Sequence, residues 1–94
     1  MQIIDIIMME DVIDKLIWKH NVSEIEVRQV FNNQPQIRLI ERGRVKGENL
    51  YVAGGETDGG RYLLVFFILK KSKKALIVAA RDMTDSERRR YAKR

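Results

Sequence analysis

The side chains of this chain that can do chemistry are a single histidine, His20, and 18 lysines and arginines. An imidazole changes its charge near neutral pH, so His20 can act as a general acid or a general base. Arginine stays charged, and its planar guanidinium group can bind two oxygens of one phosphate at once. These residue types allow acid and base catalysis by His20, assisted by arginines and without a metal ion.

Other kinds of active site lack their parts. The chain has no cysteine, which excludes a disulfide framework and thiolate chemistry, and one histidine leaves no dense set of transition-metal ligands. No glycine-rich loop has the spacing of a P-loop or of a dinucleotide-binding loop. Nothing places a serine next to His20, as a catalytic triad requires. We therefore expect neither a metal nor a cofactor.

The element that would position the arginines is the apolar stretch 61–69, whose branched and aromatic residues predict a strand buried on both faces. Leu50–Gly55 precedes it and Ala75–Ala80 follows it, and both connections are short enough for antiparallel hairpins. Arg61 enters the central strand and Arg81 leaves the next one. Because these two strand ends lie side by side in an antiparallel pair, both guanidinium groups can reach one surface site.

Two helices are predicted in the N-terminal half. The first would be capped near Asp11 and end at Asn21, and its apolar stripe, which continues to His20, consists of Ile13, Leu16 and Ile17. Residues 2–9 are rich in isoleucine and fit either a first strand or the start of this helix. We place Trp18 in the core rather than at an RNA-stacking surface.

The second helix opens at Ser23, because Ser23-x-x-Glu26 has the spacing of a capping box. Its inner face would consist of Val27, Val30 and Phe31. Gln36–Glu41 then alternates apolar and polar residues, which predicts a strand with Arg38 on its exposed side.

The C-terminal part is strongly basic. Residues 42–47 form a flexible basic loop, and Thr84-x-x-Glu87 is a second capping-box spacing that opens a terminal helix. This helix offers only Tyr91 and Ala92 as apolar residues, against five cations: Arg88, Arg89, Arg90, Lys93 and Arg94. A helix with so narrow an apolar face should dock weakly on its own sheet, which suits contact with a partner.

Together these elements predict one α+β domain spanning residues 1–94, with two N-terminal helices, an antiparallel sheet of about four to five strands and a basic C-terminal helix. The N-terminus has none of the features of a secretory signal, and no apolar run approaches the about 20 residues of a membrane span. We expect a cytoplasmic protein that has no contact with a membrane.

The net charge of +5 is unevenly distributed along the chain. Residues 1–17 carry four acidic residues and one lysine, net −3, which leaves +8 for the remainder. Such a basic part favours polyanions through counterion release, but it does not by itself separate a nucleic acid from an acidic protein.

Several short patterns resemble the BrnT family of ribonuclease toxins. Lys19-His20-Asn21-Val22-Ser23 is similar to the lysine-histidine-glycine helix junction of that family, with Asn21 in place of the glycine. The later patterns follow in the same order: Gly47-Glu48, Gly60-Arg61-x-Leu63-x-Val65, Val78-x-Ala80-Arg81 and Thr84-x-x-Glu87-Arg88-x-x-Tyr91. The resemblance covers roughly Lys15 to Tyr91, and it departs from the family at Asn49, where an arginine is common, and at Ala80, where a serine is usual.

The resemblance implies a RelE-like fold and a metal-independent endoribonuclease that belongs to a toxin–antitoxin pair. Its partner would be a ribbon-helix-helix antitoxin, which would tie the complex indirectly to DNA, as a dimer or a toxin–antitoxin heterotetramer. The alternative is a non-catalytic relative of the same fold that binds only RNA or the antitoxin. A third possibility is a structural adaptor domain.

The same resemblance assigns roles to individual residues. Cleavage without a metal requires a base for the 2′-hydroxyl, neutralisation of the phosphorane and an acid for the leaving oxygen. His20 would supply acid or base, Arg61 and Arg81 would hold the phosphate, and Glu48 would be an alternative base or orient an arginine. Contacts to RNA would come from Lys19, Arg88 and Tyr91. As alternatives, His20 is only a helix cap, and the two arginines only flank strands in solvent.

Overall fold

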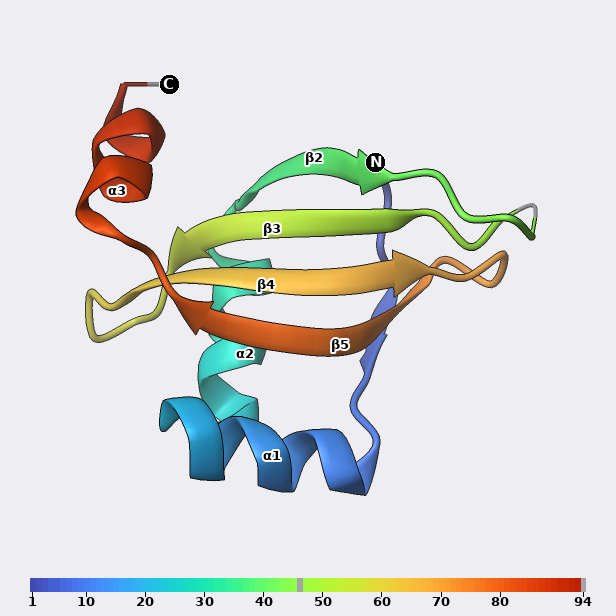
Figure 1. Ribbon diagram of the computed structural model, residues 1–94, viewed down its shortest axis with the longest axis horizontal. Helices are drawn as coiled ribbons and strands as arrows, with labels where there is room; N and C mark the ends of the chain where they lie inside the picture. Colours follow the sequence, from blue (N-terminus) through green and yellow to red (C-terminus); the bar gives the residue numbers. More distant parts are fainter. Residues whose placement is uncertain (46, 94) are drawn as a thin grey trace.

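A computed structural model describes residues 1–45 and 47–93 of the chain. Lys46 of the predicted basic loop and Arg94 of the predicted terminal helix lie outside the described residues. The elements, drawn in Figure 1, are β1 (Asp5–Ile7), α1 (Glu10–His20), α2 (Glu24–Asn32), β2 (Gln36–Glu41), β3 (Leu50–Glu56), β4 (Tyr62–Leu69), β5 (Lys74–Asp82) and α3 (Asp85–Ala92). No helix in this part of the chain is long and apolar enough to cross a membrane.

The predicted α+β class is confirmed, and the sheet has the strand order β1-β5-β4-β3-β2. Strands β2 to β5 pair antiparallel, as the short hairpin loops require. The expectation of a wholly antiparallel sheet was wrong for β1, which pairs parallel with β5. Both helices and three strands separate β1 from β5, so this connection is long enough to allow parallel pairing.

The central position of β4 is confirmed, and its two faces contribute to different clusters. Leu63, Val65 and Phe67 of β4 lie in the main core with side chains of α1 and α2. Leu64 faces the other way and packs with Val52 of β3. Figure 1 shows α2 behind the sheet, α1 alongside β5 and α3 at one end of the sheet.

The helix boundaries follow the local chemistry of the sequence. Asn21 ends α1 in a left-handed conformation with a φ of 52°, which asparagine tolerates better than most residues. The side chain of Ser23 accepts a hydrogen bond from the Glu26 N–H, and Glu26 accepts one from the Ser23 N–H, so the predicted capping box is present. The N-cap of α1 is Met9 and not Asp11, which lies in the first turn.

Two predictions for α1 were wrong. Trp18 is 83% exposed and Ile17 is 51% exposed, although both were expected to face the core. Helix α1 packs against β5, and Leu16 is its one residue that is described as buried. Because α1 lies along an outer part of the sheet, it buries a narrower stripe than the apolar positions of its sequence suggest.

Helix α3 packs on the face of the sheet opposite α1 and α2. A second capping box, formed by Thr84 and Glu87, opens it as predicted. Tyr91 is 9% exposed and joins Met83, Val52 and Leu64 in a small cluster. The helix is therefore held by little more than one buried ring, in agreement with its narrow apolar face.

Candidate functional site

Arg61 binds the junction of α1 and α2 to the ends of β4 and β5. Its Nε donates to Asp82 Oδ1 at 2.7 Å, and its terminal nitrogens donate to the carbonyl oxygens of Asn21 at 2.7 Å and His20 at 2.9 Å. An ion pair at 3.2 Å joins it to Glu26 of α2. The guanidinium group is thus surrounded by acceptors from three separate segments.

The electrostatics of this cluster fit a structural ion-pair network. The hydrogen bond from Arg61 holds the pKa of Asp82 below its ordinary value, and the nearby His20 adds to this effect. The pKa of Glu26 is also lowered: partial burial raises it, but the Ser23 N–H and Arg61 outweigh that effect. Two carboxylates therefore already neutralise the charge of Arg61.

Arg81 lies on the opposite face of the sheet. It pairs in register with Leu64, which packs in the small cluster with Tyr91 of α3. Its guanidinium group lies 5.9 Å from the centroid of the Phe66 ring. Two hydrogen bonds of 2.8 and 2.9 Å join it to the carboxylate of Glu87 in α3. The hydrogen bond from Arg81 is the main reason why the pKa of Glu87 falls to about 2.

The predicted meeting of the two arginines is present at the level of the strands, because Leu63 and Asp82 pair side by side. Asp82 contacts both guanidinium groups, through its carboxylate to Arg61 and through its carbonyl oxygen to Arg81 at 3.1 Å. The two side chains nevertheless point to opposite faces, and each is bound to a carboxylate. Sequence reasoning placed the strand ends correctly but did not foresee these acidic partners.

The other predicted site residues are spread over the molecule. Lys19 and His20 are exposed at the end of α1. Glu48 pairs with Lys70 at 3.3 Å, at the end of the sheet away from α3, so it orients neither arginine. Arg88 stacks on Tyr62 with 4.2 Å between its Cζ and the ring centroid. Tyr91 is largely buried and lines a pocket.

That pocket, with a volume of about 430 Å³, lies between α3 and the sheet face that α1 and α2 leave open. Its lining residues are Gln36, Ile37, Arg38, Val52, Gly54, Leu64, Met83, Glu87, Arg90 and Tyr91. Gly54 keeps its floor open, because a Cβ there would lie 3.2 Å from a methyl group of Leu64. We call it the α3 pocket.

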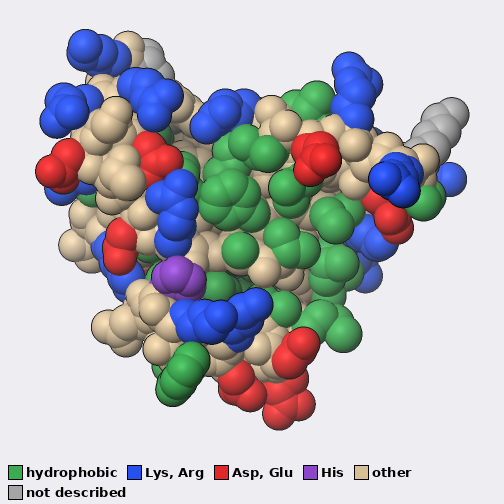
Figure 2. Space-filling model, in the orientation of Figure 1, with side chains coloured by type: hydrophobic (Ala, Val, Ile, Leu, Met, Phe, Trp, Pro, Cys, Tyr) green, Lys and Arg blue, Asp and Glu red, His purple; other side chains and the backbone are tan. Residues whose placement is uncertain are grey.

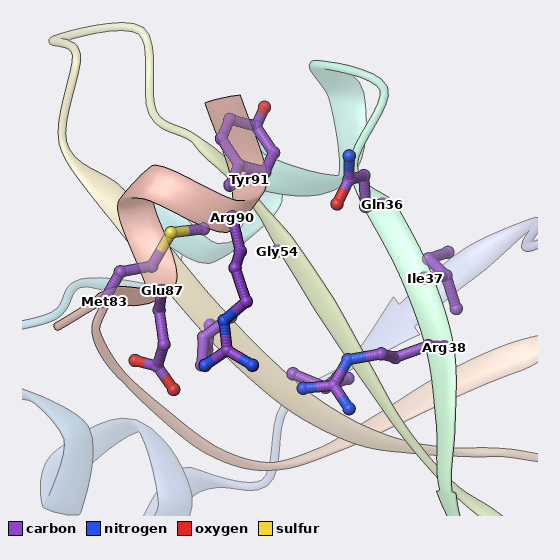
Figure 3. A pocket seen from close by; sticks show the side chains of 10 residues that line it. Gln36, Ile37, Arg38, Gly54, Met83, Glu87, Arg90 and Tyr91 are labelled. Atoms are coloured by element: carbon purple, nitrogen blue, oxygen red, sulfur yellow. The ribbon is translucent and has the colours of Figure 1, made fainter. Parts of the chain in front are cut away.

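Two arginines reach into the α3 pocket from opposite sides. Figure 3 shows Arg38 extending from β2 and Arg90 extending from α3, with their guanidinium groups directed toward the space between them. Within residues 1–45 and 47–93, neither group forms an ion pair or a hydrogen bond with another side chain. Glu87 also lines the pocket, but its carboxylate is bound to Arg81. The like charges of Arg38 and Arg90 therefore form a favourable place for an anion such as phosphate.

Sequence reasoning missed Arg38 and Arg90 as site residues. It placed Arg38 on the exposed side of its strand, which is correct, and Arg90 among the five cations of the terminal helix. Their convergence depends on where α3 lies relative to β2, and no sequence pattern encodes this placement.

Figure 2 shows the open face of the sheet as an apolar surface surrounded by lysine and arginine side chains together with several acidic ones and the histidine. The polar groups that lead away from the α3 pocket form a continuous chain of contacts. Glu87 lines the pocket and binds Arg81, which contacts Asp82, which in turn binds Arg61 near His20. In the described part of the chain, no three His, Cys, Asp or Glu side chains group closely enough to hold a metal ion.

Comparison with known proteins gives evidence at the level of the fold. No family model matches the chain, and no curated protein matches it. Among solved structures, the chain is similar to the ribonuclease toxin BrnT of Brucella abortus, with a TM-score of 0.60 and 17% sequence identity. The match covers 87% of this chain and 99% of that one. The sequence resemblance to BrnT is therefore confirmed in three dimensions, and this chain has the fold of the BrnT ribonuclease toxin.

Proposed function

We propose that the chain is an endoribonuclease toxin that cleaves RNA without a metal ion and binds its substrate in the α3 pocket. The observation that carries this proposal is the pair of guanidinium groups of Arg38 and Arg90, which face the same pocket and have no acidic partner among the described residues. The likeness to a ribonuclease toxin supports the reaction class.

In this proposal, a backbone phosphate of RNA lies between Arg38 and Arg90. Arg81 is bound to Glu87, which lines the pocket, so its positive charge lies near the phosphate while the ion pair keeps α3 in place. The three arginines would then neutralise the charge that develops when the 2′-hydroxyl attacks the phosphorus and the 5′-oxygen leaves. His20, exposed next to Asp82, would accept the proton of the 2′-hydroxyl and return it to the leaving 5′-oxygen.

The contacts of Arg61 support a positioning role. It donates to the carbonyl oxygens of His20 and Asn21, so it fixes the backbone that carries the imidazole. It also holds Asp82, whose carboxylate is close enough to His20 to interact with its charge. Arg61 would therefore act on the reaction through His20 and not on the phosphate.

A cytoplasmic ribonuclease of this kind must be inhibited in the cell that makes it. We propose a ribbon-helix-helix antitoxin as its partner, with contact to DNA only through that antitoxin. The open sheet face, apolar and flanked by cations, would suit such a partner.

The experiment is an RNA cleavage assay with purified protein in the presence of a chelator. Arg38→Ala and Arg90→Ala should each slow cleavage about tenfold or more, since each removes a charge-assisted hydrogen bond to phosphate. His20→Ala should slow it by about a hundredfold or more if the imidazole transfers a proton. Arg28→Ala is the control, because Arg28 lies on α2 and pairs with Glu24 at 3.0 Å.

Cleavage that is equally fast in the Arg38→Ala and Arg90→Ala variants would contradict the placement of RNA in the α3 pocket. Loss of cleavage in the Arg28→Ala control would show that the effect is one of net charge. Induced expression of the wild-type chain should also stop bacterial growth, and expression of the His20→Ala variant should allow it.

A second candidate function is RNA or antitoxin binding without cleavage. The observation that favours it is that both Arg61 and Arg81 are already bound to carboxylates. Under this alternative, the wild-type protein binds RNA and leaves it intact, whereas the first proposal requires shortened products.

A further inference from the structure

We propose a second binding site for RNA backbone phosphates at the end of the sheet opposite α3, formed by the β2–β3 and β4–β5 connections. This inference rests on the proposed function, because it concerns how a long RNA is held while the α3 pocket acts on it. We call this end the loop tip and define it by its cations: Arg42, Arg44, Lys70, Lys71, Lys73 and Lys74.

The two connections that form the loop tip lie against each other, at the end of the sheet away from α3 (Figure 1). A Cβ on Gly47 would lie 3.4 Å from the side chain of Lys71, and Glu48 pairs with Lys70. Between the connections is a small cleft of about 180 Å³, whose lining includes Lys70, Lys71 and Lys73. The contacts thus bring two basic segments, distant in sequence, to one place.

Most of the charge at the loop tip is uncompensated. Lys70 is the only one of the six cations that forms an ion pair with a described residue. The described residues of the tip contain a single exposed large apolar side chain, Val45. Protein interfaces have an apolar centre with charges at the rim, whereas a nucleic-acid backbone is bound by cations that need no such centre. The tip therefore fits RNA better than an acidic protein segment.

The backbone at Lys73 gives a second, independent observation. Lys73 has a φ of 68°, in the left-handed region that glycine and asparagine normally occupy in tight turns. The turn is closed by hydrogen bonds of 2.9 Å from the Lys73 N–H to the Lys70 oxygen and from the Lys70 N–H to the Lys74 oxygen. Glycine or asparagine would adopt this conformation with less strain, so the lysine adds a positive charge to the tip at a cost to the turn.

The separation of the two basic regions determines which RNA can use both. The molecule is 34 Å long along its principal axis, with the α3 pocket at one end of the sheet and the loop tip at the other. A short oligonucleotide in the α3 pocket cannot reach the tip, whereas a long RNA can follow the cations at both ends of the sheet. The tip should thus raise affinity for long RNA and leave short substrates unaffected.

The test is a binding titration with the double variant Lys71→Gln plus Lys73→Gly, using a long single-stranded RNA and a short oligonucleotide. Each phosphate contact changes the dissociation constant about threefold at moderate salt. The variant loses two such contacts, so the dissociation constant for the long RNA should rise about tenfold. The slope of log affinity against log salt should fall by about 1.4. Affinity for the short oligonucleotide should stay unchanged.

The single variant Lys73→Gly shows whether the substitutions affect folding. Glycine relieves the left-handed position, so Lys73→Gly alone should keep or raise the melting temperature while it removes one charge. The matched control for charge is Lys15→Gln plus Arg28→Gln, which removes two cations from α1 and α2. This control should bind both RNAs like the wild type.

The possible results separate the two proposals. Cleavage in the α3 pocket together with an unchanged affinity for long RNA would overturn the loop tip alone. An equal loss of affinity in the Lys15→Gln plus Arg28→Gln control would also overturn it, because the effect would then be one of net charge. No RNA binding by the wild type would overturn both proposals. A variant that loses binding to polyglutamate and keeps binding to RNA would assign the tip to an acidic protein.

Discussion

At the scale of single residues, Arg61, a predicted catalytic group, joins three separate segments of the chain. Its guanidinium group donates to two carboxylates and two carbonyl oxygens from three segments of the chain. Only an arginine can supply this number of donors in fixed directions, because a lysine offers one point of charge. The pattern Gly60-Arg61 could be read in the sequence, but the acceptors around it, distant by up to 41 positions, could not.

Arg61→Ala is therefore expected to lower the free energy of unfolding by about 2 to 4 kcal/mol, since it leaves Glu26 and Asp82 without their shared cation. Arg61→Lys should recover only a small part of this loss. Denaturant unfolding of the three proteins measures the effect. Full stability of Arg61→Ala, with loss of activity alone, would restore the interpretation of Arg61 as a direct phosphate ligand.

Local chemistry explains which residue-scale predictions succeeded. Asn21 and Ser23 determine the α1–α2 junction through a left-handed C-cap and a capping box. Both motifs involve only residues close together in the sequence, so the sequence reveals them. The prediction that Trp18 is buried was wrong, because burial depends on which other elements pack against a side chain. A helix that lies near the edge of a sheet buries fewer of its side chains than its number of apolar residues suggests.

At the scale of elements, α3 is held to the sheet by the buried ring of Tyr91, by one ion pair and by the stacking of Arg88 on Tyr62. Tyr91 supplies the apolar contact, and Arg81 with Glu87 supplies the electrostatic one. The helix closes one side of the α3 pocket and carries Arg90 into it. Its placement, and so the pocket, depends on these contacts, and the pattern of the helix itself does not reveal their partners on the sheet.

The ion pair makes the docking of α3 dependent on pH. The folded pKa of Glu87 is about 2, below the ordinary value of 4.5, so its charged form stabilises the folded state above about pH 4.5. This stabilisation is lost as the pH falls from about 4.5 to about 2. Glu87→Gln keeps a residue suited to the capping box and removes the ion pair. It should thus be less stable than the wild type at neutral pH and equally stable near pH 2.

Unfolding by denaturant across this pH range measures the difference between the two proteins, and hydrogen exchange of the α3 amides shows whether the loss is local. Asp82 and Glu26 also have lowered pKa values, but they contribute equally to both proteins. A difference in stability that stays constant from neutral pH to pH 2 would contradict the role given to the Arg81–Glu87 pair.

At the scale of the whole molecule, the fold was more predictable than the site. Periodicity and loop length specify β2 to β5 and their antiparallel pairing, because short hairpins leave little choice. Strand β1 has three residues, which is too short for an apolar–polar alternation to reveal the strand or its parallel pairing with β5. The α3 pocket draws its residues from β2, β3, β4 and α3, so it exists only once all four elements are placed.

The most direct test of the central claim, that RNA lies in the α3 pocket, is an NMR titration of the labelled protein with a short single-stranded RNA. If RNA lies in the α3 pocket, the largest shift changes will occur at Arg38, Val52 and Arg90. Shift changes confined to Lys19 and His20, or no shift changes at all, would contradict this claim.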